Sequence, residues 1–394
     1  MTDHETVIVS TARTPIGNFG GALNTTDAIG IGAAALRGAL DRSGIPPEEV
    51  SETIVGHARQ AANGPNPGRL MAVGAGIPDH VPALTTQQAC LSSLTAAILG
   101  DRSIRTGESE VVVAAGSEHM SSIPYYLMDM RWGTKAGDRV AVDGLSKDGF
   151  MDPLTGKKMG ELAEAWSERF GIDREAQDRF ALRSQQGAAH GVETGFAKQT
   201  IVPVDVPARS GTVTVDTDEH PRPDSTMEGL GRLRPAFSSD GTVTAGNASG
   251  VTDGAAAVVL ASASAAERHG AEPLARIVSS AIAAVEPKDY GLAVVPASNR
   301  ALDRAGIGYD DLDHIEINEA FAIMVLSACR QMGIDPERVN PYGGAIALGH
   351  PVGASGARVL QYAAEGLARD GGRYALATIC GNGGQGAAIV LERV

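Results

Sequence analysis

Short, almost purely apolar runs separated by longer amphipathic stretches set the pattern of this chain. The runs at residues 6–10 (TVIVS) and 110–116 (EVVVAAG) have no alternating polar positions, so they predict buried strands like those of parallel sheets. Further strands are predicted at 83–86, 255–261 and 374–379. Residues 27–42 carry apolar positions at helical spacing and stop at Gly44, which predicts a helix. Helices alternating with buried strands indicate an α/β fold.

A repeated heptamer gives the organisation of the chain. ALDRSGI at residues 39–45 recurs as ALDRAGI at 301–307. Each copy is followed by an acidic turn and then by an apolar strand, at 53–56 and 315–318. The same order of helix, turn and strand indicates a duplicated α/β unit. We therefore expect two halves related by a pseudo-twofold axis, with their equivalent helices stacked at the centre.

Between residues 120 and 245 the pattern changes, because Pro, Gly and charged residues interrupt the apolar runs. Two helices are predicted here, the first from apolar positions at i, i+3, i+4, i+7 and i+11, which are Met159, Leu162, Ala163, Trp166 and Phe170. Gly171 ends this helix, and Asp173 caps the second, at 174–190. We expect an N-terminal half at 1–119 with about 246–270, an inserted domain at 120–245, and a C-terminal half at 271–394.

Composition narrows the class of protein. The chain has 394 residues, 43% of them hydrophobic, with 49 Gly and a formal charge of −14; this fits a packed multidomain enzyme and argues against a nucleic-acid-binding surface. Three Cys form no disulfide framework and suggest a reducing compartment. The first ten residues lack the basic and apolar regions of a signal peptide, and no run of 18 apolar residues spans a membrane. We expect a cytoplasmic protein without membrane or nucleic-acid partners.

One imidazole lies in a glycine-rich string, GGAIALGHPVGASG, at residues 343–356. Its glycines permit positive φ angles and close approach of the backbone to another surface. Pro351 biases His350 away from helical conformation, and a helix is predicted at 354–367. These features fit a histidine on a close-packed turn just before a helix. From the residues alone, a hydrogen-bonded histidine in the core is an equal alternative.

Two cysteines follow predicted strands. Cys90 lies between the strand at 83–86 and a predicted helix at 91–99, and a helix N-terminus favours a thiolate and lowers the pKa of the thiol. Simple core packing is the alternative, and it is the interpretation we give to Cys329. Cys380 follows the strand at 374–379, which we expect to be the last buried strand, and opens CGNGGQG. This string contains GxGxxG, but only eight residues follow it, too few for a dinucleotide-binding unit; a turn with exposed N–H groups fits better.

The glycine-rich string around His350 closely resembles the GGAIALGHPxGASG signature of the thiolases, which make and break 3-oxoacyl-CoA thioesters. The strings NEAFA at 318–322 and GTVTAGNASGVTDG at 241–254 resemble the same family. The resemblance implies a thiolase-like fold of duplicated α/β/α/β/α layers with an inserted loop domain. It also implies an acyl-CoA C-acyltransferase, active in fatty acid metabolism or in Claisen condensation, that forms homodimers or homotetramers.

The resemblance assigns roles to residues of this chain. Cys90 corresponds to the nucleophile, His350 to its base, Cys380 to the second catalytic cysteine and Asn318 to a residue that holds a water; a helix cap is the alternative for Asn318. The turn formed by Gly381, Asn382 and Gly383 would donate N–H groups to an oxyanion. No metal and no permanently bound cofactor are implied. Coenzyme A, as substrate, would contact Phe150, Lys158, Met159, Arg222, Ala245, Ser249 and Phe321.

Several positions depart from the family pattern. Gln87 and Gln88 precede Cys90 where Asn is usual, and Leu91-Ser92-Ser93 replaces Gly-Ser-Gly. Tyr290 lies where relatives have Met beside the acyl group, which predicts an altered chain-length preference. Lys158 replaces His, and Asn382 replaces Gly. Because of these changes, a non-catalytic acyl-CoA-binding protein is an alternative interpretation. A related ketoacyl synthase would be expected to use one Cys with two His instead.

Overall fold

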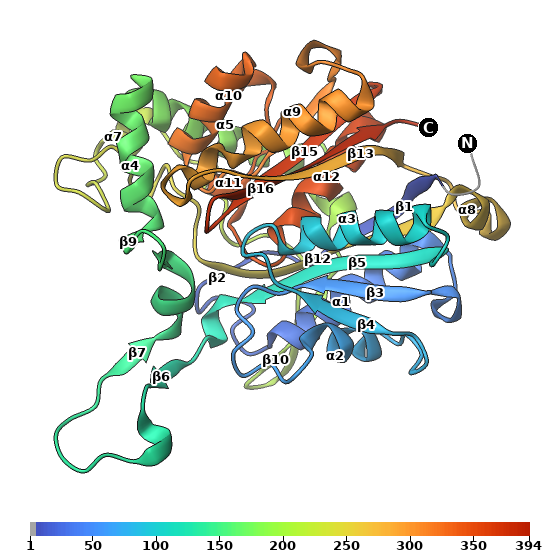
Figure 1. Ribbon diagram of the computed structural model, residues 1–394, viewed down its shortest axis with the longest axis horizontal. Helices are drawn as coiled ribbons and strands as arrows, with labels where there is room; N and C mark the ends of the chain where they lie inside the picture. Colours follow the sequence, from blue (N-terminus) through green and yellow to red (C-terminus); the bar gives the residue numbers. More distant parts are fainter. Residues whose placement is uncertain (1–4) are drawn as a thin grey trace.

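The computed structural model describes residues 5–394. Residues 1–4, which belong to the segment compared above with a signal peptide, lie outside the described residues. Figure 1 shows two similar α/β halves, one drawn in blue to cyan and the other in orange to red. The first half contains β1 (Thr6–Arg13), β3 (Glu52–Gly56), β4 (Ala83–Thr86), β5 (Val111–His119) and β12 (Thr252–Ser262). The second half contains β13 (Ala275–Ala284), β14 (His314–Ile317), β15 (Tyr374–Gly381) and β16 (Gln385–Glu392). All strands predicted from the apolar runs are present, but the prediction that the strand at 374–379 is the last one is wrong, because the buried β16 follows it.

The strand order repeats the duplication. The order is β14-β15-β16-β13-β1-β12-β5-β3-β4, with the short β2 (Gly17–Asn18) paired to β12. Reading outward from the contact between β13 and β1, each half therefore presents its first, fourth, third and second core strand. The central contact is short, because only Val7 with Arg276 and Ile8 with Ala275 are paired. Only the first half adds an edge strand, β4.

Helices form the layers around and between the strands. On the outside, α1 (Ala28–Ser43) packs against β1 and β12, and α9 (Val294–Ala305) packs against β13 and β16. Between the halves, α3 (Ser92–Arg105) contacts α12 (Ser355–Asp370). Their apolar faces form one buried cluster with strands of both halves. The expected stacking of equivalent helices at the centre is confirmed. The remaining helices of this body are α2 (Pro67–Gly74), α8 (Ala263–His269), α10 (Ala322–Met332) and α11 (Ala345–Leu348).

The repeated heptamer has the same structure in both halves. It ends α1 at Gly44 and α9 at Gly306, which have φ angles of 68° and 69°. A left-handed residue at this place ends a helix at little cost only when it is glycine. Arg42 donates to the Thr11 carbonyl, and the equivalent Arg304 donates to the Ser280 carbonyl. The heptamer therefore fixes how each outer helix is held against its strand.

A second repeated contact lies at the start of the heptamer. Ser10 Oγ donates to the carbonyl of Ala39 over 2.6 Å, and Ser279 Oγ donates to that of Ala301 over the same distance. Both serines lie directly after a β-bulge, at which the register with the neighbouring strand shifts. The bulge turns each serine toward its helix, so the duplication extends to side-chain contacts that the sequence alone does not reveal.

Arg276, on β13, binds Glu5, which directly precedes β1, and Glu392, which ends β16. Its Nη1 atom lies 3.0 Å from a carboxylate oxygen of Glu5, and its Nε atom lies 2.8 Å from one of Glu392. Arg373 also binds Glu392 over 3.0 Å. One guanidinium thus holds residues near both ends of the described chain, 5–394.

The region 120–245 flanks the two halves. Its helices are α4 (Met159–Phe170), α5 (Arg174–Glu193), α6 (Phe196–Thr200) and α7 (Met227–Gly231). Gly171 ends α4 with a φ angle of 58°, and Asp173 caps α5 by accepting from the Ala176 N–H, as predicted. Three hairpins were not predicted: β6–β7 (Tyr125–Leu127, Ala141–Asp143), β8–β9 (Met151–Asp152, Lys157–Lys158) and β10–β11 (Val204–Ala208, Gly211–Val215).

The β6–β7 hairpin extends away from the body of the molecule (Figure 1). Its strands are too short to show a period-2 pattern, which explains why the sequence did not reveal it. Trp132 in its tip is 91% exposed, and Leu127 and Val140 are also exposed. Within residues 5–394, none of the helices combines the length and apolar character needed to cross a lipid bilayer.

Candidate active site

Cys90 lies on a strained turn between β4 and α3. The helix begins at Ser92, so Cys90 precedes the first helical residue by one position more than predicted. Ala89 has a φ angle of 50°, which is uncommon for a residue with a side chain. The turn is closed by the Gln88 N–H, which donates to Ser92 Oγ over 2.9 Å. At this bend the chain enters the boundary between the two halves, with Cys90 on the turn, and then leaves it.

The expected lowering of the Cys90 pKa is wrong. Burial raises the pKa of this thiol to about 11, although Arg59 and the backbone N–H groups of Cys90 and Asn382 act in the opposite direction. Two contributions compete, because removal of a thiolate from water is unfavourable while a helix terminus and a cation favour it. Packing against the other half of the molecule decides the outcome, and the local sequence does not contain that information.

His350 lies on a buried turn, as predicted. Gly349 before it has a φ angle of 100°, and the one-turn helix α11 precedes it, which was not predicted. The Nδ1 atom of His350 lies 2.6 Å from Ser355 Oγ, and that hydroxyl donates to the Pro351 carbonyl. The Ser355 oxygen therefore accepts the Nδ1 proton, and Nε2 keeps its lone pair. Burial, with the charges of Arg358 and Arg59, lowers the pKa of His350 to about 3, so its ring is neutral.

Asn318 contacts the free nitrogen of this imidazole. Its Nδ2 atom lies 3.5 Å from His350 Nε2, and its Oδ1 atom accepts from Arg358 over 3.3 Å. Asn318 does not cap the following helix, because α10 begins at Ala322 and its N-cap is Phe321. The helix-cap alternative is therefore wrong. Asn318 instead follows directly on β14, with its side chain fully buried beside His350.

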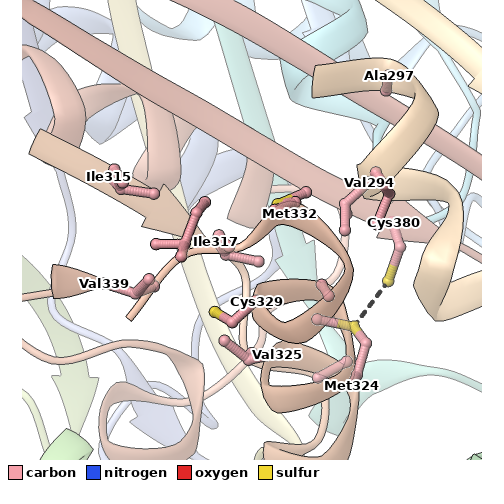
Figure 2. Packing of buried hydrophobic residues seen from close by; sticks show 14 of the residues in the cluster. Val294, Ala297, Ile315, Ile317, Met324, Val325, Cys329, Met332, Val339 and Cys380 are labelled. Atoms are coloured by element: carbon pink, nitrogen blue, oxygen red, sulfur yellow. Dashed lines mark hydrogen bonds between the residues drawn. The ribbon is translucent and has the colours of Figure 1, made fainter. Parts of the chain in front are cut away.

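Cys380 lies near the end of β15, and the glycine-rich string that follows is the turn between β15 and β16. Figure 2 shows the Cys380 thiol pointing toward Met324 on α10, at an Sγ–Sδ distance of 3.1 Å. Burial raises the pKa of Cys380 well above its ordinary value, and the charge of Cys90 raises it further. Cys329 lies in the same apolar cluster and is fully buried, so its interpretation as a core residue is confirmed.

The hairpin turn approaches Cys90 closely. Gly383 and Gly384 both have φ angles of 82°, whereas Asn382 has no positive φ and needs no left-handed conformation. A Cβ atom at Gly381 would collide with the Leu91 side chain and lie 3.4 Å from the Cys90 nitrogen. A larger residue at 381 would therefore require the end of the buried Leu91 side chain to move. The backbone N–H of Asn382 then faces the Cys90 sulfur, and this hydrogen bond acts to lower the pKa of that thiol.

Two further contacts complete the assembly. Cys90 packs against a small apolar cluster that contains Ala58 and Val352, the latter two residues after His350. Gln88 Nε2 donates to Gln385 Oε1 over 2.5 Å, which joins the turn before Cys90 to the hairpin after Cys380. The structure therefore brings together two thiols from opposite halves, a neutral imidazole, a buried amide and a backbone N–H group.

Comparisons with known proteins agree with this arrangement. The family model for the N-terminal domain of thiolase matches residues 6–264, and that for the C-terminal domain matches residues 271–393. An acetyl-CoA acetyltransferase of Pseudomonas aeruginosa is 46% identical over 390 residues, covering 99% of each chain. The cytosolic acetyl-CoA acetyltransferase of Mus musculus is 45% identical over 389 residues and covers 98% of each. The crystal structure of the Bacillus anthracis acetyl-CoA acetyltransferase superposes with a TM-score of 0.97 at 41% identity, covering 99% of each chain.

The chain belongs to the thiolase family. The resemblance of its sequence strings to thiolases is confirmed over nearly the full length, and so is the thiolase-like fold.

The positions matched to thiolase coenzyme A contacts lie along the edge of the inserted region. The Ser249 N–H donates to the Ala320 carbonyl over 3.0 Å, next to Phe321. Phe321 and Phe237 meet edge to face with ring centroids 6.0 Å apart, and Phe237 also covers Gly160, the residue after Met159. Met159, Ser249 and Phe321 therefore lie around one aromatic pair.

The other positions in this set are more exposed. Lys158 and Ala245 are exposed, and Phe150 is 36% exposed at the end of a single turn, Ser146–Phe150. Arg222 is exposed before α7, where its N–H donates to Gln185 Oε1. Tyr290 of this thiolase is buried, with its hydroxyl donating to the Met159 carbonyl over 3.1 Å and its ring 5.1 Å from that of Trp166. Burial raises the pKa of the Tyr290 hydroxyl well above its ordinary value, and the charges of Cys380 and Cys90 raise it further.

Sequence reasoning missed two side chains of this site. Ser355 orients His350 and lies five residues after it, within the same glycine-rich string, so the sequence contained the signal for this contact. The charge of Arg59 acts to lower the pKa of both Cys90 and His350. It follows β3, which is parallel to β4, and loops after the carboxyl ends of parallel neighbours meet at one edge of the sheet. That rule could have placed Arg59 near Cys90.

Proposed function

We propose that this thiolase transfers acyl groups between Cys90 and coenzyme A, cleaving 3-oxoacyl-CoA to acetyl-CoA and a shortened acyl-CoA, or condensing two acetyl-CoA molecules in reverse. The observation that carries the proposal is the meeting of Cys90 and Cys380 from opposite halves, with a neutral His350 beside them. Acyl transfer needs a nucleophile, a base and oxyanion donors, and each of these has a candidate in this cluster. The relatives are acetyl-CoA acetyltransferases, which supports the same activity.

In the first step of cleavage, His350 Nε2 takes the proton of Cys90 as the sulfur attacks C3 of the substrate. Because the pKa of Cys90 is raised and that of His350 is lowered, both groups are neutral at rest, and proton transfer accompanies attack. The C2–C3 bond then breaks, and its electron pair passes to the departing acetyl-CoA as an enolate. Cys380 donates a proton to C2, which releases acetyl-CoA and leaves an acyl group on Cys90.

In the second step, Cys380, now a thiolate, takes the proton of the incoming coenzyme A thiol. The coenzyme A sulfur attacks the acyl-Cys90 carbonyl, and the C–S bond to Cys90 breaks, with a proton returning from His350 to that sulfur. The turn at Gly381, Asn382 and Gly383 supplies N–H groups to the tetrahedral oxyanion, together with the Cys90 N–H. Each such donor contributes about 3–4 kcal/mol to transition-state stabilisation. His350 and a water held by Asn318 face the enolate oxygen.

Coenzyme A is proposed as a substrate held along the inserted region, which would form a separate domain at 120–245 between an N-terminal half at 1–119 with about 246–270 and a C-terminal half at 271–394. Met159, Ser249 and Phe321 provide apolar and backbone contacts around the Phe237 ring, with Phe150 and Ala245 beside them. Lys158 and Arg222 provide the positive charge that phosphate groups require. No permanently bound cofactor takes part in these steps.

Self-association is part of the proposal. The β6–β7 hairpin exposes Trp132, Leu127 and Val140 on an extension that contacts little of its own chain, and an exposed apolar surface of this kind is typical of protein interfaces. A homodimer or homotetramer would cover it. The name of the mouse relative places that protein in the cytosol, which supports a cytoplasmic location for this thiolase.

The test is a thiolysis assay with acetoacetyl-CoA and coenzyme A, together with mass spectrometry of the protein after incubation with acetyl-CoA. The wild type should cleave the substrate and gain one acetyl group on Cys90. Cys90→Ala should lose both properties, while the control Cys329→Ala should keep them, since Cys329 is a core residue. Ligand binding without turnover or labelling in the wild type would show a binding protein instead of an enzyme.

A further inference from the structure

A cavity of about 570 Å³ lies beside Cys90, and Asn382 is the member of its wall that also belongs to the proposed catalytic set. Its walls come from the loop after β3, the turn before Cys90, the inserted region and the β15–β16 hairpin. Among the residues that line it are Arg59, Gln88, Tyr126, Lys147, Asn382 and Gln385. Side chains with amide and cationic groups make this cavity unsuited to a plain alkyl chain, since such a chain would separate these groups from water without replacing their hydrogen bonds.

Arg59 is the unusual member of this wall. It is only 7% exposed, yet its guanidinium forms no ion pair and no hydrogen bond with any residue between 5 and 394. Its Nε atom is completely buried without a partner. The backbone of Gly149 packs so closely against the guanidinium that a Cβ atom there would collide with it. A buried charge without a partner is strongly unfavourable, so this arrangement indicates a ligand that supplies the missing anion.

The acidic residues nearby are already engaged. Asp148 accepts from the Tyr126 hydroxyl over 2.7 Å. Glu118 accepts from the backbone N–H groups of Ala58, Arg59 and Gly353, and lies 3.2 Å from His57. Lys147 adds a second positive charge to the cavity wall. The balance of charge in the cavity is therefore positive, and the Arg59 fork is available to a carboxylate, which it can bind through two parallel hydrogen bonds.

The position of the cavity identifies which part of a substrate would reach it. Gln88 and Ala89, which line it, directly precede Cys90, and Asn382 presents its N–H group to the Cys90 sulfur. Arg59 is close enough to act on the pKa of Cys90. An acyl group bound to Cys90 would therefore extend its far end toward Arg59, while the coenzyme A portion lies toward Met159 and Phe321.

We propose that Arg59 binds a carboxylate at the far end of the acyl chain, so that this enzyme acts on 3-oxoacyl-CoA thioesters of dicarboxylic acids. The assignment rests on the proposed function. Cleavage breaks the same C2–C3 bond and leaves the distal carboxylate unchanged, so the products are acetyl-CoA and a shortened acyl-CoA that still ends in a carboxylate. Gln88 and Gln385, joined to each other, present further amide groups along the path.

The experiment compares kcat/KM for 3-oxohexanedioyl-CoA, which ends in a carboxylate, with that for 3-oxohexanoyl-CoA, its neutral counterpart of equal length. The wild type should favour the carboxylated substrate by roughly 100-fold or more, as expected when a buried cation is otherwise left unpaired. This comparison needs no variant. Arg59→Met should reduce the ratio of the two kcat/KM values about 100-fold, mainly through KM. Arg209→Met, on an exposed arginine in the turn between β10 and β11, should leave the ratio unchanged.

Each outcome decides a different point. Equal kcat/KM values for the two substrates in the wild type would overturn the assignment of Arg59, while cleavage of acetoacetyl-CoA in the same preparation would leave the proposed function standing. Loss of activity toward both substrates by the same factor in Arg59→Met would also overturn it, since Arg59 would then act only on Cys90. A wild type that fails to cleave acetoacetyl-CoA and both longer substrates would overturn the proposed function itself.

Discussion

The Nδ1 atom of His350 lies 2.6 Å from the hydroxyl oxygen of Ser355, five residues further along the chain. Because this hydroxyl donates its own proton to the Pro351 carbonyl, it can only accept from the imidazole. The contact fixes the proton on Nδ1 and leaves Nε2 as the basic atom, on the side where Asn318 lies. A serine on the first turn of α12 therefore decides which nitrogen of His350 is free to accept a proton in the proposed reaction.

Replacement of Ser355 tests this role. Ser355→Ala leaves a buried N–H group without an acceptor, which costs about 1–3 kcal/mol, and allows the imidazole to turn. We expect kcat for thiolysis of acetoacetyl-CoA to fall by roughly tenfold or more, with KM for coenzyme A little changed. Ser327→Ala is the control, because the Ser327 hydroxyl is buried in α10 without a partner in the described chain. An equal loss of kcat in both variants would contradict a positioning role for Ser355.

The raised pKa of Cys90 predicts how its reactivity depends on pH. The thiolate is the reactive form, and with a pKa of about 11 the thiol is almost fully protonated at neutral pH. In the absence of substrate, alkylation of Cys90 by iodoacetamide should become about tenfold faster per pH unit between pH 7 and 10. The site is identified by peptide mass spectrometry. A rate that levels off below pH 8 would mean that Cys90 is a thiolate at rest.

The two cysteines should separate into two half-reactions. Cys380→Ser removes the thiol proposed to exchange protons with C2 of acetyl-CoA, and a serine hydroxyl is a much weaker acid. We expect this variant still to accept an acetyl group on Cys90, but no longer to exchange the methyl protons of acetyl-CoA in D₂O, as followed by proton NMR. Cys329→Ala should show both properties. Undiminished exchange in Cys380→Ser would exclude Cys380 as the acid–base group.

A buried ion pair gives a prediction for stability. The guanidinium of Arg13, which is 1% exposed, forms two parallel hydrogen bonds to Asp218 over 2.6 and 2.8 Å. Asp218→Ala leaves this charge buried without a partner and should lower the free energy of unfolding by about 3–5 kcal/mol. Asp79→Ala removes the partner of Arg69 in an ion pair at 3.8 Å where Asp79 is 91% exposed, and should cost about 1 kcal/mol or less. Denaturant unfolding measures both.

The sequence predicts the parts of this molecule that depend on neighbours along the chain. Gly44 and Gly306 end helices in both repeats, and Gly349 takes the positive φ angle that a crowded turn before His350 needs. Each of these follows from backbone geometry at one position. Apolar runs likewise predict the buried strands, because strands covered on both faces have no polar alternation.

What the sequence could not supply depends on contacts between distant segments. The pKa of Cys90 is set by burial against the second half, so a rule based on the adjacent helix gives the wrong direction. Arg59 has no motif around it, and its importance comes from the lack of a partner, which only the folded chain reveals. The short hairpins of the inserted region are held by turns and side-chain contacts, and their strands of two to five residues are too short for a periodic pattern.

The ion pairs of Arg276 with Glu5 and Glu392 have a consequence for how the order of segments in this chain could be redesigned. Since one guanidinium holds Glu5 and Glu392 together, a short peptide could join those neighbouring segments. The chain could be opened instead at the exposed Glu272, in the stretch after α8 that connects the repeats. Such a circular permutant would be synthesised with its second repeat first. If it assembles, the order in which a ribosome makes the two repeats is irrelevant to their docking.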